Sequence, residues 1–185
     1  MIDDILLTAE DHMSKTIAVA SEEFAGIRTG RANPGMFTKL LVDYYGAPTP
    51  LQQIASITVP EARTVLITPY DKSAMTSIER AIRDSDLGVN PSDDGTVIRL
   101  VMPELTTERR KEYIKLARHK AEEARVAIRA TRHKSRESLN RIQRDGDAGE
   151  DEVHRAEHEL DQLTKRFVGK VDALLEHKEA ELLEV

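Results

Sequence analysis

The distribution of proline places the strongest constraint on what this chain can fold into. All seven prolines of the 185 residues fall between Pro34 and Pro103. A proline inside a helix removes a backbone hydrogen bond and clashes with the preceding turn, so long helices exclude it. Residues 1–33 and 104–185 contain none. The sequence therefore predicts long helices in both flanking segments and a different kind of structure between them.

The first and last segments carry apolar residues at the spacing of a helix face. In the first segment this face comprises Leu6, Ala9, Met13, Thr16, Ala20, Phe24 and Ile27. It stops at Thr29–Gly30, where we expect the helix to end before Asn33–Pro34. In the last segment the face comprises Val153, Ala156, Leu160, Leu163, Phe167, Val171, Leu174 and Leu182.

A third helix is expected from Thr106 or Thr107 to Arg144, because no helix breaker interrupts that stretch. At 1.5 Å per residue it would be roughly 58 Å long. Small residues dominate its apolar seam, which comprises Tyr113, Ala117, Ala121, Ala124, Ile128, Thr131, Ser135, Ser138 and Ile142. Residues 145–149 form a turn into the last helix. Three long helices with narrow seams predict a three-helix bundle.

The proline-bearing middle has the alternation and turn residues of a small β-rich domain. Leu40, Val42 and Tyr44 alternate with polar neighbours, as in a half-buried strand. A turn at residues 46–50 is followed by short β-branched runs at 54–59 and 64–68 and by a last strand at 97–101. Asp71 can cap a short helix between these strands.

The predicted fold class is therefore α+β, with a small β/α/β domain inserted into a long helical bundle. We expect residues 1–30 and 105–185 to form the bundle and residues 31–104 the inserted domain. The chain would cross this junction twice, near Gly30–Arg31 and near Pro103–Leu105. A double connection resists twisting and favours hinge motion about the line through both crossings.

Charge is sorted along the chain far more than the net charge of −6 suggests. Residues 106–144 carry 13 basic and five acidic side chains, a net +8, whereas residues 145–185 carry −8. At about 100° per residue, six basic side chains share one face of the long helix. They form the arginine stripe: Lys111, Arg118, Arg125, Arg129, Arg132 and Arg136.

The arginine stripe predicts binding of RNA or another polyanion. Its guanidinium groups suit planar, bidentate contact with phosphates or base edges. One alternative is a solvated face on which acids of the same helix, such as Glu122, neutralise the arginines. Another alternative is pairing with the acidic last helix. The arginine stripe lies about 110° around the helix from the apolar seam, which argues against such pairing.

Several other functions are excluded or disfavoured. The chain has no cysteine, no glycine-rich phosphate loop and no apolar run of membrane length. Its acidic start also differs from a signal peptide. We therefore expect a cytoplasmic, non-enzymatic protein without a cofactor. His154 and His158 match an H-x-x-E-H zinc pattern, but no third ligand is evident, so we expect no metal. Tyr44 and Tyr45 could stack on bases, but alternation leaves at most one exposed.

Several strings resemble the bacterial ribosome recycling factor family. They are RTGRANP at 28–34, DYYG at 43–46 with TPL at 49–51, SDLGVNP at 85–91, LTTERR at 105–110 and KEAELL at 178–183. The likeness spans essentially the whole chain. It implies an L-shaped molecule in which a three-helix bundle carries a small β/α/β domain on flexible hinges.

The resemblance also implies a function and a set of sites. Family members bind the post-termination ribosome through large-subunit RNA and, with elongation factor G and GTP, help split it into subunits. The family's main RNA-contacting arginines correspond to Arg129 and Arg132, and further basic positions to Arg110 and Arg28. The hinge corresponds to Gly30, Arg31, Pro103, Glu104, Leu105 and Thr106. We expect a monomer that binds neither membrane nor DNA.

The chain departs from many relatives beside these arginines. Residues 128–133 read I-R-A-T-R-H where V-R-N-I/V-R-R is common, so Ala130, Thr131 and His133 replace an amide, an aliphatic side chain and a permanent charge. Two other classes of function stay open from the residues alone. One is an adaptor whose basic face meets an acidic protein, and the other is a zinc enzyme using the H-x-x-E-H pattern.

Overall fold

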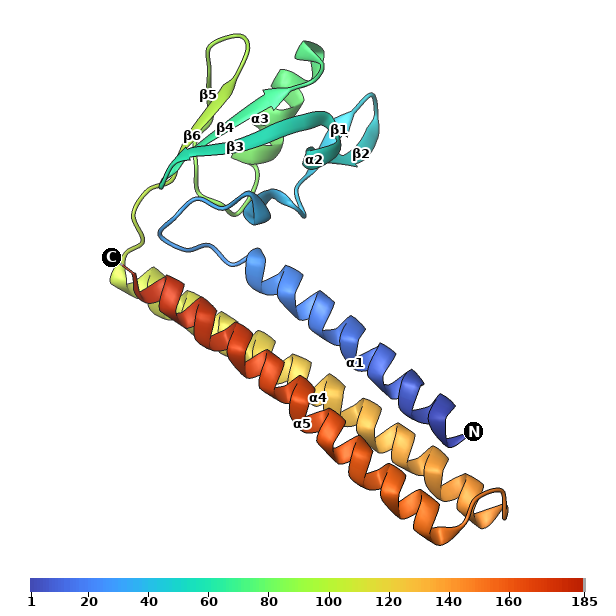
Figure 1. The fold of residues 1–185 in the computed structure, drawn as a ribbon. Helices are drawn as coiled ribbons and strands as arrows, with labels where there is room; N and C mark the ends of the chain where they lie inside the picture. The colour runs from blue at the N-terminus through green and yellow to red at the C-terminus, as the bar shows by residue number, and fades with distance from the viewer. Residues whose placement is uncertain (185) are drawn as a thin grey trace. The chain divides into compact units, whose positions relative to one another are not determined.

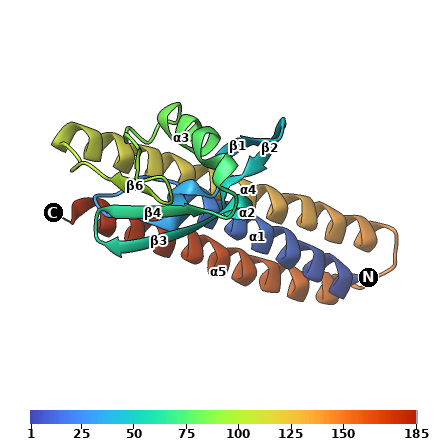
Figure 2. The same ribbon diagram turned by 90° about the horizontal axis from the view of Figure 1, so that it is seen from above.

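Three long helices account for most of the chain in this computed structural model, which describes residues 1–184. They are α1 (Ile2–Ala25), α4 (Thr107–Arg144) and α5 (Glu150–Leu183). The helices run side by side in both views (Figures 1 and 2). The expected seams face inward, because Met13, Ala117, Ile128 and Val171 are fully buried. The predicted three-helix bundle is therefore present.

Local signals set the ends of the long helices. The hydroxyl of Thr106 accepts a hydrogen bond from the backbone N–H of Arg109 at 3.2 Å, so it caps α4 as expected. Gly146 adopts a φ of 81° in the turn between α4 and α5, a conformation that suits glycine. Three acids, Glu150, Asp151 and Glu152, occupy the first turn of α5, where they complement the helix dipole.

The first helix is shorter than the sequence predicted. It ends at Ala25 rather than near Thr29, and Ile27 is buried beyond its end. A 3-10 turn, Pro34–Phe37, approaches this end of the helix. A Cβ built at Gly35 would lie 3.2 Å from that of Ala25, so tertiary contact decides where the chain leaves the helix.

The middle of the chain forms a four-stranded antiparallel sheet in the order β3–β4–β6–β5. Its strands are β3 (Ala55–Glu61), β4 (Thr64–Pro69), β5 (Ser92–Asp93) and β6 (Ile98–Val101). Three of them fall where alternation predicted strands. The short strand β5 was not expected, because two residues are too few to show a periodicity.

A separate two-stranded ribbon corrects one prediction. Strand β1 (Leu41–Tyr44) pairs antiparallel with β2 (Ala47–Pro50), although residues 46–50 were expected to be only a turn. Prolines are tolerated in β2 because neither of its edges joins the larger sheet. Tyr45 and Gly46 make the tight turn with φ of 51° and 83°.

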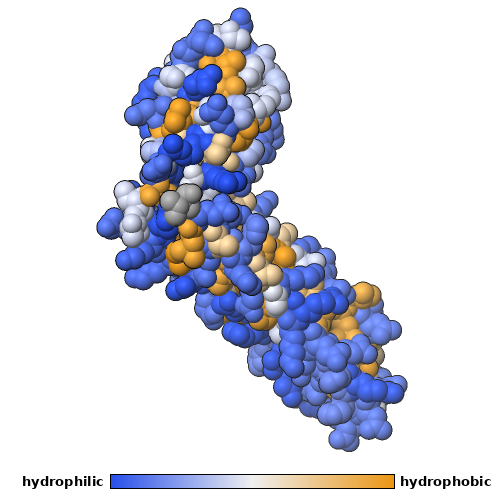
Figure 3. Space-filling view, turned by 60° about the vertical axis from the view of Figure 1, so that its left-hand side comes forward, coloured by the Kyte–Doolittle hydropathy of each residue, from blue (hydrophilic) through white to orange (hydrophobic). Residues whose placement is uncertain are grey.

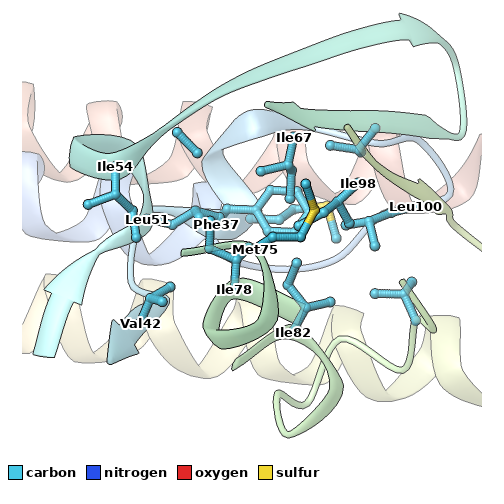
Figure 4. Close-up of a cluster of buried hydrophobic side chains, with 14 of the residues drawn as sticks. Phe37, Val42, Leu51, Ile54, Ile67, Met75, Ile78, Ile82, Ile98 and Leu100 are labelled. Carbon is cyan, nitrogen blue, oxygen red and sulfur yellow. The ribbon is translucent and has the colours of Figure 1, made fainter. Parts of the chain in front are cut away.

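Two short helices complete the small domain: α2 (Leu51–Ile54) and α3 (Met75–Arg83). As predicted, Asp71 caps the helical segment that begins with the 3-10 turn Lys72–Ala74, since its carboxylate accepts from Ser73 N–H. Ile78 and Ile82 of α3 lie against side chains of the sheet, including Ile67, in a buried apolar cluster (Figure 4).

The chain divides into two compact units. One contains residues 1–24 and 115–179, and the other contains residues 25–114 and 180–184. Helices α4 and α5 each contribute residues to both units. The domain boundaries near residues 30 and 105 stay a prediction. Within residues 1–184, no helix is long and apolar enough to cross a membrane.

Candidate nucleic-acid interface

The arginine stripe lies along α4, and its members differ in exposure. The side chains of Arg118, Arg129 and Arg136 are more than half exposed, whereas Arg125 retains 20% and Arg132 retains 40%. Lys111 is exposed and forms no ion pair within residues 1–184. The surface around the helices is mostly hydrophilic in the view of Figure 3.

Acids of α5 pair with four of the five arginines in the stripe. Arg118 donates to Glu179 at 2.6 Å, Arg125 to Asp172 at 2.6 Å, and Arg136 to Glu157 at 3.2 Å, while Arg132 lies 3.4 Å from Asp161. The sequence argument against such pairing was wrong. Positions flanking a seam face the neighbouring helix in a bundle, and an arginine is long enough to reach across.

Arg125 is the most firmly held member of the arginine stripe. Its Nε and Nη2 both donate to Oδ1 of Asp172, at 2.9 and 2.6 Å, and its Nη1 donates to Glu122 at 3.1 Å. The hydrogen bond to Asp172 raises the pKa of Arg125, and Glu122 adds to this effect. Each guanidinium nitrogen donates one bond, so only one N–H on each terminal nitrogen is left for a phosphate.

Arg129 and Arg132 are held more loosely. Arg129 lies 3.6 Å from Glu122 of its own helix, and Arg132 lies 3.4 Å from Asp161 of α5. Neither guanidinium donates a hydrogen bond within residues 1–184. Their donors are therefore available to a ligand at little cost, because ion pairs without hydrogen bonds contribute little at an exposed site.

These two arginines open onto a groove between α4 and α5. Lys165, Val168 and Gly169 of α5 line the same groove. A Cβ built at Gly169 would have nothing within 4 Å, so the space above this glycine is open. The groove brings Arg129, Arg132 and Lys165 together, although Asp161 and Asp172 also line it. Three cations beside an open helix surface suit an anionic backbone.

The departures from the family pattern leave these arginines in place. Ala130 is exposed, and the hydroxyl of Thr131 bonds to the Ala127 carbonyl at 3.2 Å. His133 lies 3.6 Å from Glu137 of the same helix. None of the three residues pairs with Arg129 or Arg132, so the substitutions do not occupy the two guanidinium groups.

Arg28 and Arg110 belong to the unit that contains the small domain, together with Lys111 at the start of the stripe. A terminal nitrogen of Arg28 donates to the carbonyl of Pro103, so it joins the two segments predicted as a hinge. The Nε of each arginine is buried without a hydrogen-bond partner. Arg110 also lines a hollow with Gly30, Arg31 and Glu104.

Further bonds tie the segments predicted as a hinge. The hydroxyl of Thr29 accepts from the backbone N–H of Arg31 at 3.3 Å, and Arg31 Nε lies 3.5 Å from the carboxylate of Glu184. Arg63 lies 3.3 Å from Glu104. Leu105 also lines the hollow beside these residues, while Thr106 caps α4. The side chains of both ion pairs are partly exposed.

The remaining candidates have ordinary local roles. His158 lies 3.1 Å from the amide nitrogen of Gln162, and residues 1–184 contain no cluster of three potential metal ligands. Tyr44 packs against the core, whereas Tyr45 is 78% exposed and donates its hydroxyl to Asp71 at 2.8 Å. Only one of the two tyrosines is available for stacking.

Comparison with known proteins points to one class, the non-enzymatic translation factors. Residues 20–183 match the family described as ribosome recycling factor. Proteins named ribosome-recycling factor from Beutenbergia cavernae and Kineococcus radiotolerans are 65% and 63% identical to this chain, over the full length of each.

Two solved structures have the same fold. A solution structure of the ribosome recycling factor has 38% identity and a TM-score of 0.79, covering all of this chain and 98% of the other. A second has 43% identity and a TM-score of 0.71, with both chains fully covered. Its description is of models of the Thermus thermophilus factor and Escherichia coli elongation factor G bound to the E. coli post-termination complex. The chain belongs to the ribosome recycling factor family.

Proposed function

We propose that this protein recycles ribosomes after termination of translation. It binds the post-termination ribosome through large-subunit RNA and, with elongation factor G and GTP, promotes dissociation into subunits. Support comes from the family membership and from the related factor bound with elongation factor G to a post-termination complex. This role would place the protein in the cytoplasm, acting as a monomer on each ribosome.

The observation that carries the RNA-binding part of this proposal is the state of Arg129 and Arg132. Both are charged, partly exposed and free of hydrogen bonds within residues 1–184. They form the centre of the proposed RNA contact. Arg118 and Arg136 each bond an acid through Nε alone, so their terminal nitrogens can still donate to phosphates.

The other predicted RNA-binding residues have peripheral roles in the proposal. Lys111 offers an unpaired charge at the start of the arginine stripe. Arg125 steadies the contact mainly by holding α4 to α5. Arg110 and Arg28 act near the hinge, where Arg28 already bonds to Pro103.

Mechanical splitting is assigned to the small domain and its double connection. In this account the bundle, residues 1–30 and 105–185, docks on RNA, while residues 31–104 are displaced by the translocase. The hinge would comprise Gly30 and Arg31 on one crossing and residues 103–106 on the other. The ion pairs at these segments are partly exposed, so breaking them should cost little compared with opening the apolar core.

The experiment that tests the proposal is subunit splitting by purified components. Post-termination ribosomes are mixed with this protein, elongation factor G and GTP, and dissociation is followed by light scattering. We expect splitting only when all components are present. Stable intact ribosomes under these conditions would overturn the proposed function, and binding that survives RNase treatment would favour an adaptor for an acidic protein.

A further inference from the structure

The ion pairs between α4 and α5 fall into two registers: those of Arg118 and Arg125 share one, and those of Arg132 and Arg136 are displaced from it by about one turn of α5. Arg118 and Arg125 lie seven residues apart on α4, and their partners Glu179 and Asp172 lie seven residues apart on α5, in the opposite order. Seven residues make two turns of a helix in a bundle, so each step brings the next facing pair together. The next step reaches Arg132 on α4 and Lys165 on α5.

Lys165 therefore occupies the position at which an acid would continue the ladder. Arg132 instead approaches Asp161, which lies four residues, or about one helical turn, away from Lys165 along α5. That ion pair is longer than those of Arg118 and Arg125 and has no hydrogen bond. Lys165 itself is exposed and forms no ion pair within residues 1–184.

The change of register leaves Lys165 without an ion pair within residues 1–184, beside two arginines whose ion pairs are long and lack hydrogen bonds. Lys165 lines the groove that Arg129 and Arg132 also line. The groove acids are largely engaged, because Asp172 accepts both bonds from Arg125 and Asp161 lies beside Arg132. Arg132 and Lys165 occupy facing positions in the register of Arg118 and Arg125, and their like charges repel, so the arrangement is unfavourable for the bundle alone. An anionic ligand between the helices would reverse that cost.

We propose that Lys165 of α5 joins Arg129 and Arg132 in a three-cation site that binds the phosphate backbone of RNA across the α4–α5 groove. The proposal rests on the proposed function and refines its RNA contact. It moves the centre of that contact from a stripe on one helix to a groove between two. Gly169, one turn beyond Lys165, leaves room for a backbone to approach.

An ordinary solvated lysine would also be exposed and unpaired, so the test must separate the two. The full-length variant Lys165→Glu would restore the missing acid opposite Arg132. We expect its melting temperature to rise by about 1 °C, because an added exposed ion pair contributes little. We expect its affinity for purified 70S ribosomes to fall by about tenfold, because one phosphate contact is lost and a repulsive charge is added. If Lys165 is only a solvated lysine, the melting temperature should not rise while the ribosome affinity falls.

Lys134→Glu is the matched control. It makes the same change in charge on an exposed lysine of α4, about 200° around the helix from Arg132. We expect it to lower the affinity less than twofold. In Lys165→Ala, the slope of log affinity against log salt concentration should decrease in magnitude by about one unit. Equal effects of the 165 and 134 substitutions would overturn the proposal, and so would a fall in the melting temperature of Lys165→Glu.

Arg132→Glu distinguishes failure of this inference from failure of the proposed function. If Arg132→Glu weakens ribosome binding while Lys165→Glu matches its control, the RNA contact stands without Lys165. If neither variant weakens binding, the proposed RNA-binding face itself is wrong.

Cross-linking identifies the chemical class of the partner. The chain has no cysteine, so Lys165→Cys provides a unique attachment point for a photoreactive group. We expect adducts on 70S ribosomes to be degraded by RNase, with no such adduct from Lys134→Cys. An adduct with a ribosomal protein in place of RNA would overturn the assignment to phosphate.

Discussion

Arg125 of α4 donates two hydrogen bonds to a single carboxylate oxygen of Asp172 on α5, at 2.9 and 2.6 Å. Two turns further along α4, Arg132 only approaches Asp161, at 3.4 Å. Arg125 therefore mainly holds α4 to α5, whereas Arg132 keeps its N–H donors available to a ligand. Substitution of the two arginines should therefore lower the free energy of unfolding to different extents.

We expect Arg125→Ala to lower the free energy of unfolding by about 1 kcal/mol, because a partly buried, charge-assisted contact between α4 and α5 is lost. Arg132→Ala should lower it by less than about 0.5 kcal/mol, because its ion pair is long and exposed. Urea denaturation followed by circular dichroism measures both values. Equal destabilisation by the two substitutions would contradict the division of roles.

Gly169 offers a prediction about stability alone. It lies within α5, where glycine costs about 1 kcal/mol relative to alanine, and its missing Cβ would meet nothing within 4 Å. Gly169→Ala should therefore raise the free energy of unfolding by about 0.5–1 kcal/mol. A loss of stability in urea denaturation would show that the groove is more crowded than it is in this structure.

The sequence predicted the long helices well, because their apolar faces recur over many turns and no proline interrupts them. It did not predict the pairing of β2, since prolines usually mark a turn, nor the early end of α1, which depends on contact with residues distant in the chain. The acidic partners of the arginine stripe were missed for a similar reason. The angular position of the arginines within α4 does not show which charges meet, because the register between α4 and α5 decides that.

A signal for that register was present in the sequence. Glu179 and Asp172 repeat the seven-residue spacing of Arg118 and Arg125 in reverse order. Antiparallel alignment of the two heptad patterns predicts these pairs and places Lys165 opposite Arg132. The exact bond lengths, which separate Arg125 from Arg132, require the packed structure.

In the small domain, the carboxyl groups of Glu79 and Asp93 interact, and this interaction should make stability depend on pH. The pKa of Glu79 is raised by its hydrogen bond to Asp93, by burial and by the charge of Asp93, against an opposing effect of Arg83. The protonated form of Glu79 is thus favoured by folding. Its contribution is fully present below the ordinary glutamate pKa and is lost as pH rises through the higher folded value.

We therefore expect Glu79→Gln to raise the melting temperature at pH 7, because glutamine resembles the protonated acid. The difference from the unsubstituted protein should shrink as the pH is lowered toward 4. Asp84→Asn, at an exposed acid near the end of α3, serves as the control. Destabilisation of Glu79→Gln at neutral pH would show that the ionised form is the one favoured.

Hinge motion can be tested by joining the two sides of the proposed hinge. Arg31 Nε lies 3.5 Å from Glu184 Oε2, so cysteines at these positions can be linked by a short thiol cross-linker. In this cysteine-free chain we expect the linked Arg31→Cys/Glu184→Cys protein to bind ribosomes normally but to lose splitting activity. The same double variant without cross-linker is the control. Normal splitting by the linked form would rule out the proposed motion.

The central claim, that exposed arginines of α4 dock the bundle on RNA, is tested most directly by ribosome binding of Arg132→Glu. We expect its affinity for 70S ribosomes to fall by at least about tenfold at physiological salt, since a phosphate contact is replaced by repulsion. Its circular dichroism should be unchanged, and Lys134→Glu should bind normally. Binding of Arg132→Glu with undiminished affinity would contradict the account.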